Sequence, residues 1–131
     1  MGYRTDHSRA RGLGAAKHGA GHWIAERVSA IALIPLCVWI VFAAIRLARG
    51  DYSTAVNFIA NPFNAVLLAL LILTGFWHMH AGMRVIVEDY VHEEGSKLFW
   101  ITILNFLALI GTVTALFAIL KIAFAAPGGM V

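Results

Sequence analysis

The stretch LILTGFWHMHAGMRVIVEDYVHEEG, residues Leu71–Gly95, decides what kind of fold this chain can have. It begins as a continuous run of apolar side chains, but it carries two histidines, His78 and His80, within that run. It then ends in the polar group Glu88–Tyr90. An ionisable side chain inside a membrane span is costly and therefore indicates a functional site.

The composition of the whole chain agrees with a membrane location. Of its 131 residues, 60% are hydrophobic and only 13% are charged, too few polar groups to cover a soluble globule of this size. The formal net charge is +3, and the first basic residues are Arg4, Arg9, Arg11 and Lys17, ahead of the first apolar run. Without a groove-reading motif, this charge favours the positive-inside signal of a membrane protein over nucleic-acid binding.

The single cysteine, Cys37, limits the chemistry further. One cysteine excludes an intrachain disulfide and a cysteine-based metal cluster. A small apolar role inside its span is the ordinary expectation.

The apolar runs predict an all-α membrane protein with three transmembrane helices, and a unit this small with a histidine inside one span suggests a partner. Each run is long enough to cross a hydrocarbon core of roughly 30 Å. Pro35 is expected to kink the first helix, and Gly95 to stop a helix in the second loop. The expected organisation is a basic N-terminal arm (1–20), a transmembrane anchor domain (21–124, with spans at about 23–48, 62–88 and 98–124), connecting segments at 51–61 and 89–97, and a C-terminal tail (125–131).

The distribution of Lys and Arg predicts the orientation. The arm, the edge of the first span and the second loop with its edge hold seven of these residues, and the other side holds three, which accounts for all 10 in the chain. The positive-inside rule therefore predicts a cytoplasmic N-terminus.

Helical geometry sorts the side chains of the second span into two faces. His78, Gly82 and Asp89 lie within about 40° of one another at about 100° per residue, whereas His80 is turned by about 200° and shares its face with Arg84. The two histidines therefore cannot both ligate one metal from this helix. A lone buried imidazole suits haem iron, and Gly82 leaves room for a flat macrocycle. An interhelical hydrogen bond or a proton relay are the alternatives that spacing leaves open.

A family resemblance adds to these observations. The run H-x-x-x-G-M followed by D-Y, here His78, Gly82–Met83 and Asp89–Tyr90, resembles the smaller of the two membrane anchors of succinate dehydrogenase, or complex II. The stretch HWIAERVSAIALIPL, residues 22–36, is similar to the first helix of that family. The resemblance covers roughly residues 20–124 and implies that the chain forms half of an anchor bundle shared by two subunits.

The resemblance implies a shared haem b. His78 would be one axial ligand of the haem iron, and the companion membrane anchor of the complex would supply the other. Arg27 would pair with the haem propionates, and Ser29 would line the same pocket beside Gly82. This sequence departs from the family pattern in carrying His80, which is the alternative ligand if the register is shifted.

The resemblance also implies a site for ubiquinone, the substrate. Tyr90 would donate a hydrogen bond to a quinone carbonyl, and Asp89 would orient an arginine of the companion anchor and take part in protonation. These two residues are the expected catalytic groups. The chain would have no activity alone, because the partner flavoprotein would hold the FAD and the partner iron–sulfur protein the iron–sulfur clusters.

The expected function is therefore the membrane-anchor subunit of succinate:ubiquinone oxidoreductase, an enzyme of the tricarboxylic acid cycle and electron transport. The expected location is the bacterial inner membrane, with the mitochondrial inner membrane less expected; lipids but no nucleic acid are expected partners. The alternatives are an anchor of a fumarate reductase or another b-type cytochrome, and a non-redox membrane scaffold.

Overall fold

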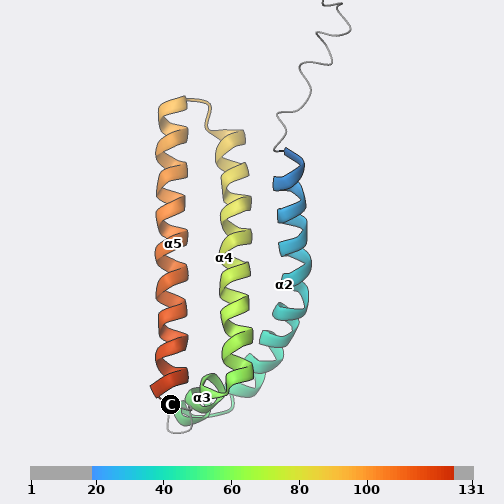
Figure 1. The fold of residues 1–131 in the computed structure, drawn as a ribbon, viewed down its shortest axis with the longest axis vertical. Helices are drawn as coiled ribbons and strands as arrows, with labels where there is room; N and C mark the ends of the chain where they lie inside the picture. Colours follow the sequence, from blue (N-terminus) through green and yellow to red (C-terminus); the bar gives the residue numbers. More distant parts are fainter. Residues whose placement is uncertain (1–18, 126–131) are drawn as a thin grey trace, which may run out of the picture.

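Three long helices make up most of the protein. In the computed structural model, which describes residues 19–125, these are α2 (Gly19–Leu47), α4 (Pro62–Tyr90) and α5 (Glu94–Ala125), with the short α3 (Tyr52–Ala60) between the first two (Figure 1). All three long helices are apolar and long enough to cross a membrane. The predicted three-span, all-α fold is confirmed, and the chain is an integral membrane protein. The expected arm (1–20) and tail (125–131) fall almost entirely outside the described residues.

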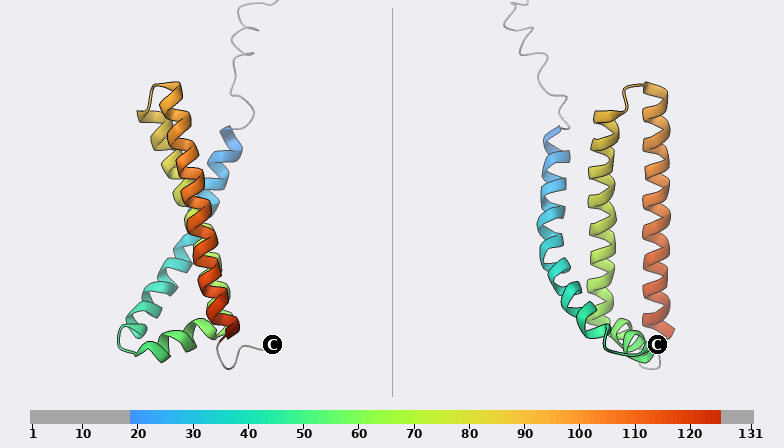
Figure 2. Two further views of the ribbon diagram at one scale, coloured as in Figure 1. Left: turned by 90° about the vertical axis from the view of Figure 1, so that its left-hand side faces the viewer. Right: turned by 180° about the vertical axis from the view of Figure 1, so that it is seen from behind.

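The long helices are arranged side by side, with α4 in the middle (Figures 1 and 2). α4 packs against α5 on one side and α2 on the other. Among residues 20–125, only Ser29, Ala43 and Ala81 are buried within the chain. A single layer of helices leaves most apolar side chains uncovered, as expected for a chain whose surface meets lipid and partner helices.

Helix α2 continues through Pro35 without interruption. The helix curves in its second half, and its C-terminal end runs away from α4, so that α3 has to cross back to the start of α4 (Figure 2, left). Proline removes one backbone donor and displaces the carbonyl of the preceding turn, which is a common cause of such bends. The kink expected at Pro35 is thus realised as a bend within one continuous helix.

The segment between the first two spans contains a helix that the sequence analysis did not predict. Asp51 caps α3, because its Oδ1 accepts hydrogen bonds from the Thr54 hydroxyl at 2.7 Å, the Thr54 N–H at 2.9 Å and the Ser53 hydroxyl at 2.9 Å. These bonds, the Thr54 hydroxyl foremost, lower the pKa of Asp51 to about 2. The connecting segment expected at 51–61 is therefore an amphipathic helix that crosses the end of the bundle (Figure 2).

Helix α4 begins with a strong capping arrangement. The Oδ1 of Asn61 accepts the N–H groups of Phe63 and Asn64, and Pro62 occupies the first helical position. A proline there loses no hydrogen bond, because that N–H has no partner within the helix.

The second loop is shorter than expected. α4 continues to Tyr90 and α5 begins at Glu94, which leaves only Val91–Glu93 between them. Gly95 lies in the first turn of α5, so the prediction that it stops a helix is wrong. The preceding Glu94 supports this helix start, because it places a negative charge at the positive end of the helix dipole.

The contact between α4 and α5 is close at one point. A Cβ added to Gly111 of α5 would lie only 2.5 Å from Cε1 of Phe76 of α4. The missing side chain at Gly111 is what lets the Phe76 ring sit against the α5 backbone. Small residues at helix contacts are a common way for membrane helices to approach.

Candidate functional site

His78 lies half-buried in the middle of α4 and faces α2. Its Nδ1 lies 3.0 Å from the hydroxyl oxygen of Ser29, a residue of α2 that is only 7% exposed. The two residues are 49 positions apart in the sequence, so this bond ties the first and second spans together.

The hydrogen bonds of Ser29 determine which nitrogen of His78 carries the proton. The Ser29 hydroxyl donates its single proton to the backbone carbonyl of Glu26 at 2.8 Å. Its oxygen can therefore only accept from His78, which requires a proton on Nδ1. The neutral ring then keeps a lone pair on Nε2, the form in which histidine ligates a metal while its other nitrogen is held by a hydrogen bond.

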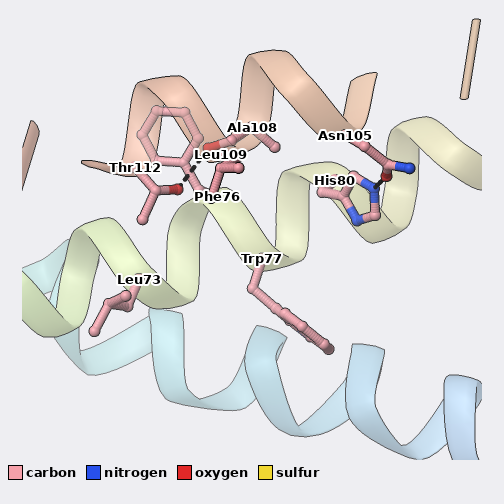
Figure 3. A pocket seen from close by; sticks show the side chains of 8 residues that line it. All are labelled: Leu73, Phe76, Trp77, His80, Asn105, Ala108, Leu109 and Thr112. Atoms are coloured by element: carbon pink, nitrogen blue, oxygen red, sulfur yellow. Dashed lines mark hydrogen bonds between the residues drawn. The ribbon is translucent and has the colours of Figure 1, made fainter. Parts of the chain in front are cut away.

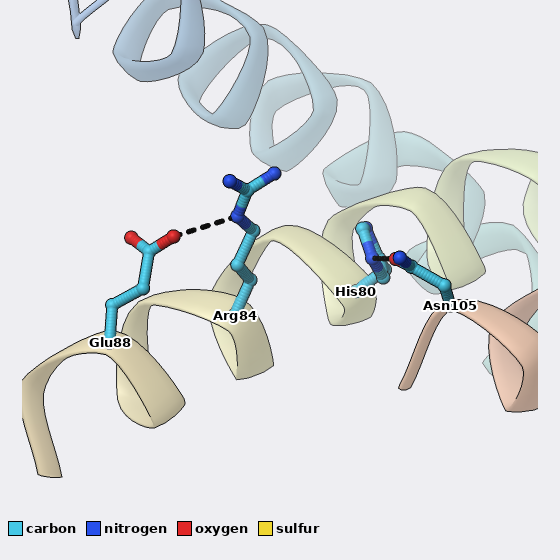
Figure 4. A network of polar contacts seen from close by, with 4 residues as sticks. All are labelled: His80, Arg84, Glu88 and Asn105. Carbon is cyan, nitrogen blue, oxygen red and sulfur yellow. Dashed lines mark hydrogen bonds and ion pairs between the residues drawn. The ribbon is translucent and has the colours of Figure 1, made fainter. Parts of the chain in front are cut away.

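His80 is engaged in the opposite way. Its Nε2 lies 2.6 Å from Oδ1 of Asn105 in α5, and because an amide oxygen can only accept, Nε2–H donates (Figure 4). The nitrogen left free on His78 is thus the one occupied on His80. The interhelical hydrogen bond that the sequence left open as an alternative role for a membrane histidine is present at His80.

A cavity of about 260 Å³ lies beside His80, between α4 and α5 (Figure 3). Its lining is mostly apolar, with polar atoms from His80, Asn105 and Thr112. The Thr112 hydroxyl donates to the carbonyl of Ala108 in its own helix at 2.7 Å. Each of these three side chains thus has one hydrogen-bond partner within the chain.

Arg84 lies on the same side of α4 as His80, one turn closer to the C-terminal end of the helix (Figure 4). Its Nε donates to Oε1 of Glu88 at 2.8 Å, and both side chains are nearly half exposed. An i, i+4 pair of this kind contributes a few tenths of a kcal/mol at an exposed site. This pair neutralises both charges near the end of the span and uses neither for the site at His78.

Gly82 follows His78 by one helical turn, and a Cβ added there would meet no atom of the chain within 4 Å. Packing within this chain therefore does not require glycine at this position, in contrast to Gly111. The surface beside His78 is open to a group from outside the chain.

The remaining predicted residues lie toward the same end of the bundle. Arg27 is exposed on α2, and its guanidinium carbon lies 5.5 Å from the ring centroid of Trp23 one turn earlier. Asp89 and Tyr90 are the last two residues of α4 and both are exposed, Tyr90 at 79%. The structure thus brings Ser29 and His78 into direct contact and leaves Arg27, Asp89 and Tyr90 available at the rim.

Two groups that help to orient the histidines, one indirectly through Ser29 and one by direct contact, were missed from the sequence. The carbonyl of Glu26 orients the Ser29 hydroxyl, and no sequence signal reveals a backbone acceptor. Asn105 had a signal, because an amide inside the uncharged third span is uncommon and usually finds a partner on another helix.

The sequence matches one protein family over nearly its whole length. Residues 1–120 match the family described as the succinate dehydrogenase/fumarate reductase transmembrane subunit. The chain therefore belongs to this family of transmembrane subunits.

Curated relatives make the resemblance more specific. The chain is 24% identical to the succinate dehydrogenase hydrophobic membrane anchor subunit of Rickettsia bellii, over 88% of this chain and 94% of that protein. It is 31% identical to the succinate dehydrogenase membrane anchor subunit of Reclinomonas americana, over 71% and 80%. It is 34% identical to the corresponding hydrophobic subunit of Paracoccus denitrificans, over 74% and 75%. The resemblance to a succinate dehydrogenase membrane anchor that the sequence motif suggested is confirmed.

Proposed function

We propose that this chain is the smaller membrane anchor of succinate dehydrogenase, contributes His78 as one axial ligand of a haem b, and forms one wall of the ubiquinone-reduction site. The other axial ligand comes from the companion membrane anchor. The partner flavoprotein holds the FAD, and the partner iron–sulfur protein holds the iron–sulfur clusters. The complex lies in the bacterial inner membrane with the N-terminus of this chain in the cytoplasm, as the charge distribution predicts.

The hydrogen bond from His78 to Ser29 is the observation that carries the haem assignment. It holds the proton on Nδ1 and leaves the Nε2 lone pair available. The open surface at Gly82 gives a planar ring room to approach that side of α4. A bound haem b would supply a one-electron redox centre there.

The residues at the rim support the quinone assignment. Tyr90 presents a hydroxyl donor and Asp89 a carboxylate at the exposed end of α4. Reduction of a quinone consumes two protons, so a hydrogen-bond donor beside a carboxylate in contact with water suits this chemistry. Arg27 lies on α2 two residues before Ser29, where a cation can pair with propionates.

Absorption spectra of the detergent-purified complex test the haem assignment. Dithionite reduces haem whether or not it lies on the electron path, so dithionite-minus-oxidised spectra report haem content directly. We expect a b-type band in the wild type and in His80→Ala, and its loss in His78→Ala. The opposite pattern would move the ligand to His80, and a wild type without haem would favour the scaffold alternative.

Two exposed tyrosines at opposite ends of the bundle test the quinone assignment. Tyr90 ends α4, and Tyr52, which is 85% exposed, begins α3. Removing one preorganised hydrogen-bond donor commonly lowers turnover by about 10²-fold. We expect Tyr90→Phe to lower succinate-driven ubiquinone reduction on this scale, and Tyr52→Phe to leave it unchanged. Equal rates in Tyr90→Phe and the wild type would exclude Tyr90 from the quinone site.

A further inference from the structure

A second cavity lies at the end of the bundle that carries α3, away from His78. It measures about 540 Å³. The C-terminal half of α2, the short helix α3 and the start of α4 enclose it. Its lining consists of Trp39, Phe42, Ala43, Arg46, Leu47, Thr54, Asn57, Phe58, Asn61 and Asn64.

One wall of this cavity is apolar and is held in place by an aromatic contact. The rings of Trp39 on α2 and Phe58 on α3 stack with centroids 5.8 Å apart and an angle of 22° between their planes. Phe42, Ala43 and Leu47 extend the same apolar surface along α2. A surface of this kind, at the end of a transmembrane helix, accommodates hydrocarbon.

The other wall offers hydrogen-bond donors. Asn64 Nδ2 donates to the carbonyl of Phe58 at 3.0 Å, which fixes the start of α4 against α3. Within residues 19–125, the side chains of Arg46 and Asn57 form no hydrogen bond or ion pair. A guanidinium and an amide are thus both available to a ligand.

The charge of the lining selects the ligand. Arg46 is its one formally charged residue, and no carboxylate faces the cavity among the described residues. Guanidinium groups bind phosphate through paired hydrogen bonds, which arginine provides better than lysine. A zwitterionic headgroup would leave its ammonium without a counter-charge here, whereas an anionic headgroup would not.

We propose that this cavity binds the headgroup of an anionic phospholipid from the membrane leaflet at the α3 end. Arg46 and Asn57 hold the phosphodiester oxygens, and one acyl chain follows the surface formed by Trp39, Phe42 and Phe58. The amphipathic helix α3, which crosses the end of the bundle, forms the floor of the site (Figure 2). Amphipathic helices of this kind lie at the depth of the lipid headgroups.

Native mass spectrometry of the intact, detergent-purified complex tests this proposal by counting bound phospholipids. Arg46→Gln removes the charge and the paired donors, and Arg49→Gln is the matched control, because Arg49 carries the same charge three residues on but does not line the cavity. We expect the wild type and Arg49→Gln to retain one phosphatidylglycerol per copy of this chain that Arg46→Gln lacks. Titration should show about tenfold weaker binding in Arg46→Gln.

Added ligands distinguish the sources of phosphate. We expect phosphatidylglycerol, but not phosphatidylcholine, to refill a delipidated wild-type complex, and inorganic phosphate not to displace it. Equal lipid counts in wild type and Arg46→Gln, equal binding of both lipids, or displacement by inorganic phosphate would each overturn the proposal. If Arg46→Gln fails to assemble, Asn57→Leu takes its place, with weaker lipid binding expected and an unchanged lipid count contradicting the proposal.

Discussion

His78 and His80 lie two residues apart on one helix, yet their surroundings differ in a way that separates their roles. His78 gives its Nδ1–H to Ser29 of α2 and keeps Nε2 free, whereas His80 gives its Nε2–H to Asn105 of α5. The surface next to His78 is open at Gly82, whereas on the side of α4 that faces α5 the Phe76 ring lies directly against the backbone at Gly111, and a cavity remains beside His80. Under the proposed function, this difference favours His78 over His80 as the haem ligand.

The largest difference between the two histidines is expected when their hydrogen-bond partners, Ser29 and Asn105, are each replaced by alanine. Ser29→Ala removes the acceptor that holds the His78 ring, and the loss of such a supporting bond typically weakens metal binding by about 10–100-fold. We therefore expect haem to be lost from Ser29→Ala at far lower concentrations of a competing haem acceptor, such as apomyoglobin, than from the wild type.

Asn105→Ala is the matched control, because it removes the partner of His80 in the same manner. We expect its haem retention and its reduced spectrum to match those of the wild type. If Asn105→Ala loses haem as readily as Ser29→Ala, the difference between the two histidines disappears, and both would have to be treated as part of one site.

Smaller effects on the complex are expected from substituting two glycines, Gly82 of α4 and Gly111 of α5. Gly111→Ala places a Cβ within 2.5 Å of Phe76, and overpacking of this kind costs about 1–3 kcal/mol. We expect a lower thermal midpoint of the purified complex.

Gly82→Ala places its Cβ where it meets no atom of this chain, so we expect no steric clash within the chain. The new methyl group would instead occupy the surface on which the haem ring is proposed to lie, so we expect a lower haem content.

A second substitution tests whether the contact with Phe76 causes the lower thermal midpoint expected for Gly111→Ala. Phe76→Leu removes the ring that the new methyl group would meet, so Gly111→Ala should cost less in the Phe76→Leu background than in the wild type. Strictly additive effects would show that Phe76 and Gly111 do not interact.

Much of the architecture was accessible from the sequence because membrane spans depend on length and polarity. The runs that became α2, α4 and α5 carry so few charges that their number and approximate extent followed directly. The start of the second span, expected at about residue 62, also agrees with the start of α4 at Pro62. Helix α3 was missed, although Asp51 precedes it as a cap, because nine residues between two spans read as an ordinary connection.

The environment of the site was less accessible. Periodicity gave the angle between His78 and His80, but not which neighbouring helix each would meet, because this depends on the lateral order of the helices. The sequence therefore could not pair His78 with Ser29, nor His80 with Asn105. The free nitrogen on His78 depends on a backbone carbonyl at Glu26, which has no sequence signature.

The bond between Ser29 and His78 also has a consequence for biogenesis. Both residues belong to one polypeptide and meet as soon as α2 and α4 have been inserted and packed together. The imidazole is therefore oriented, with its proton on Nδ1, by contacts within this chain alone. Under the proposed function, haem insertion would then begin from a half-site with little rotational freedom left to lose, which would favour an assembly order in which this chain captures the haem first and its partner closes over it.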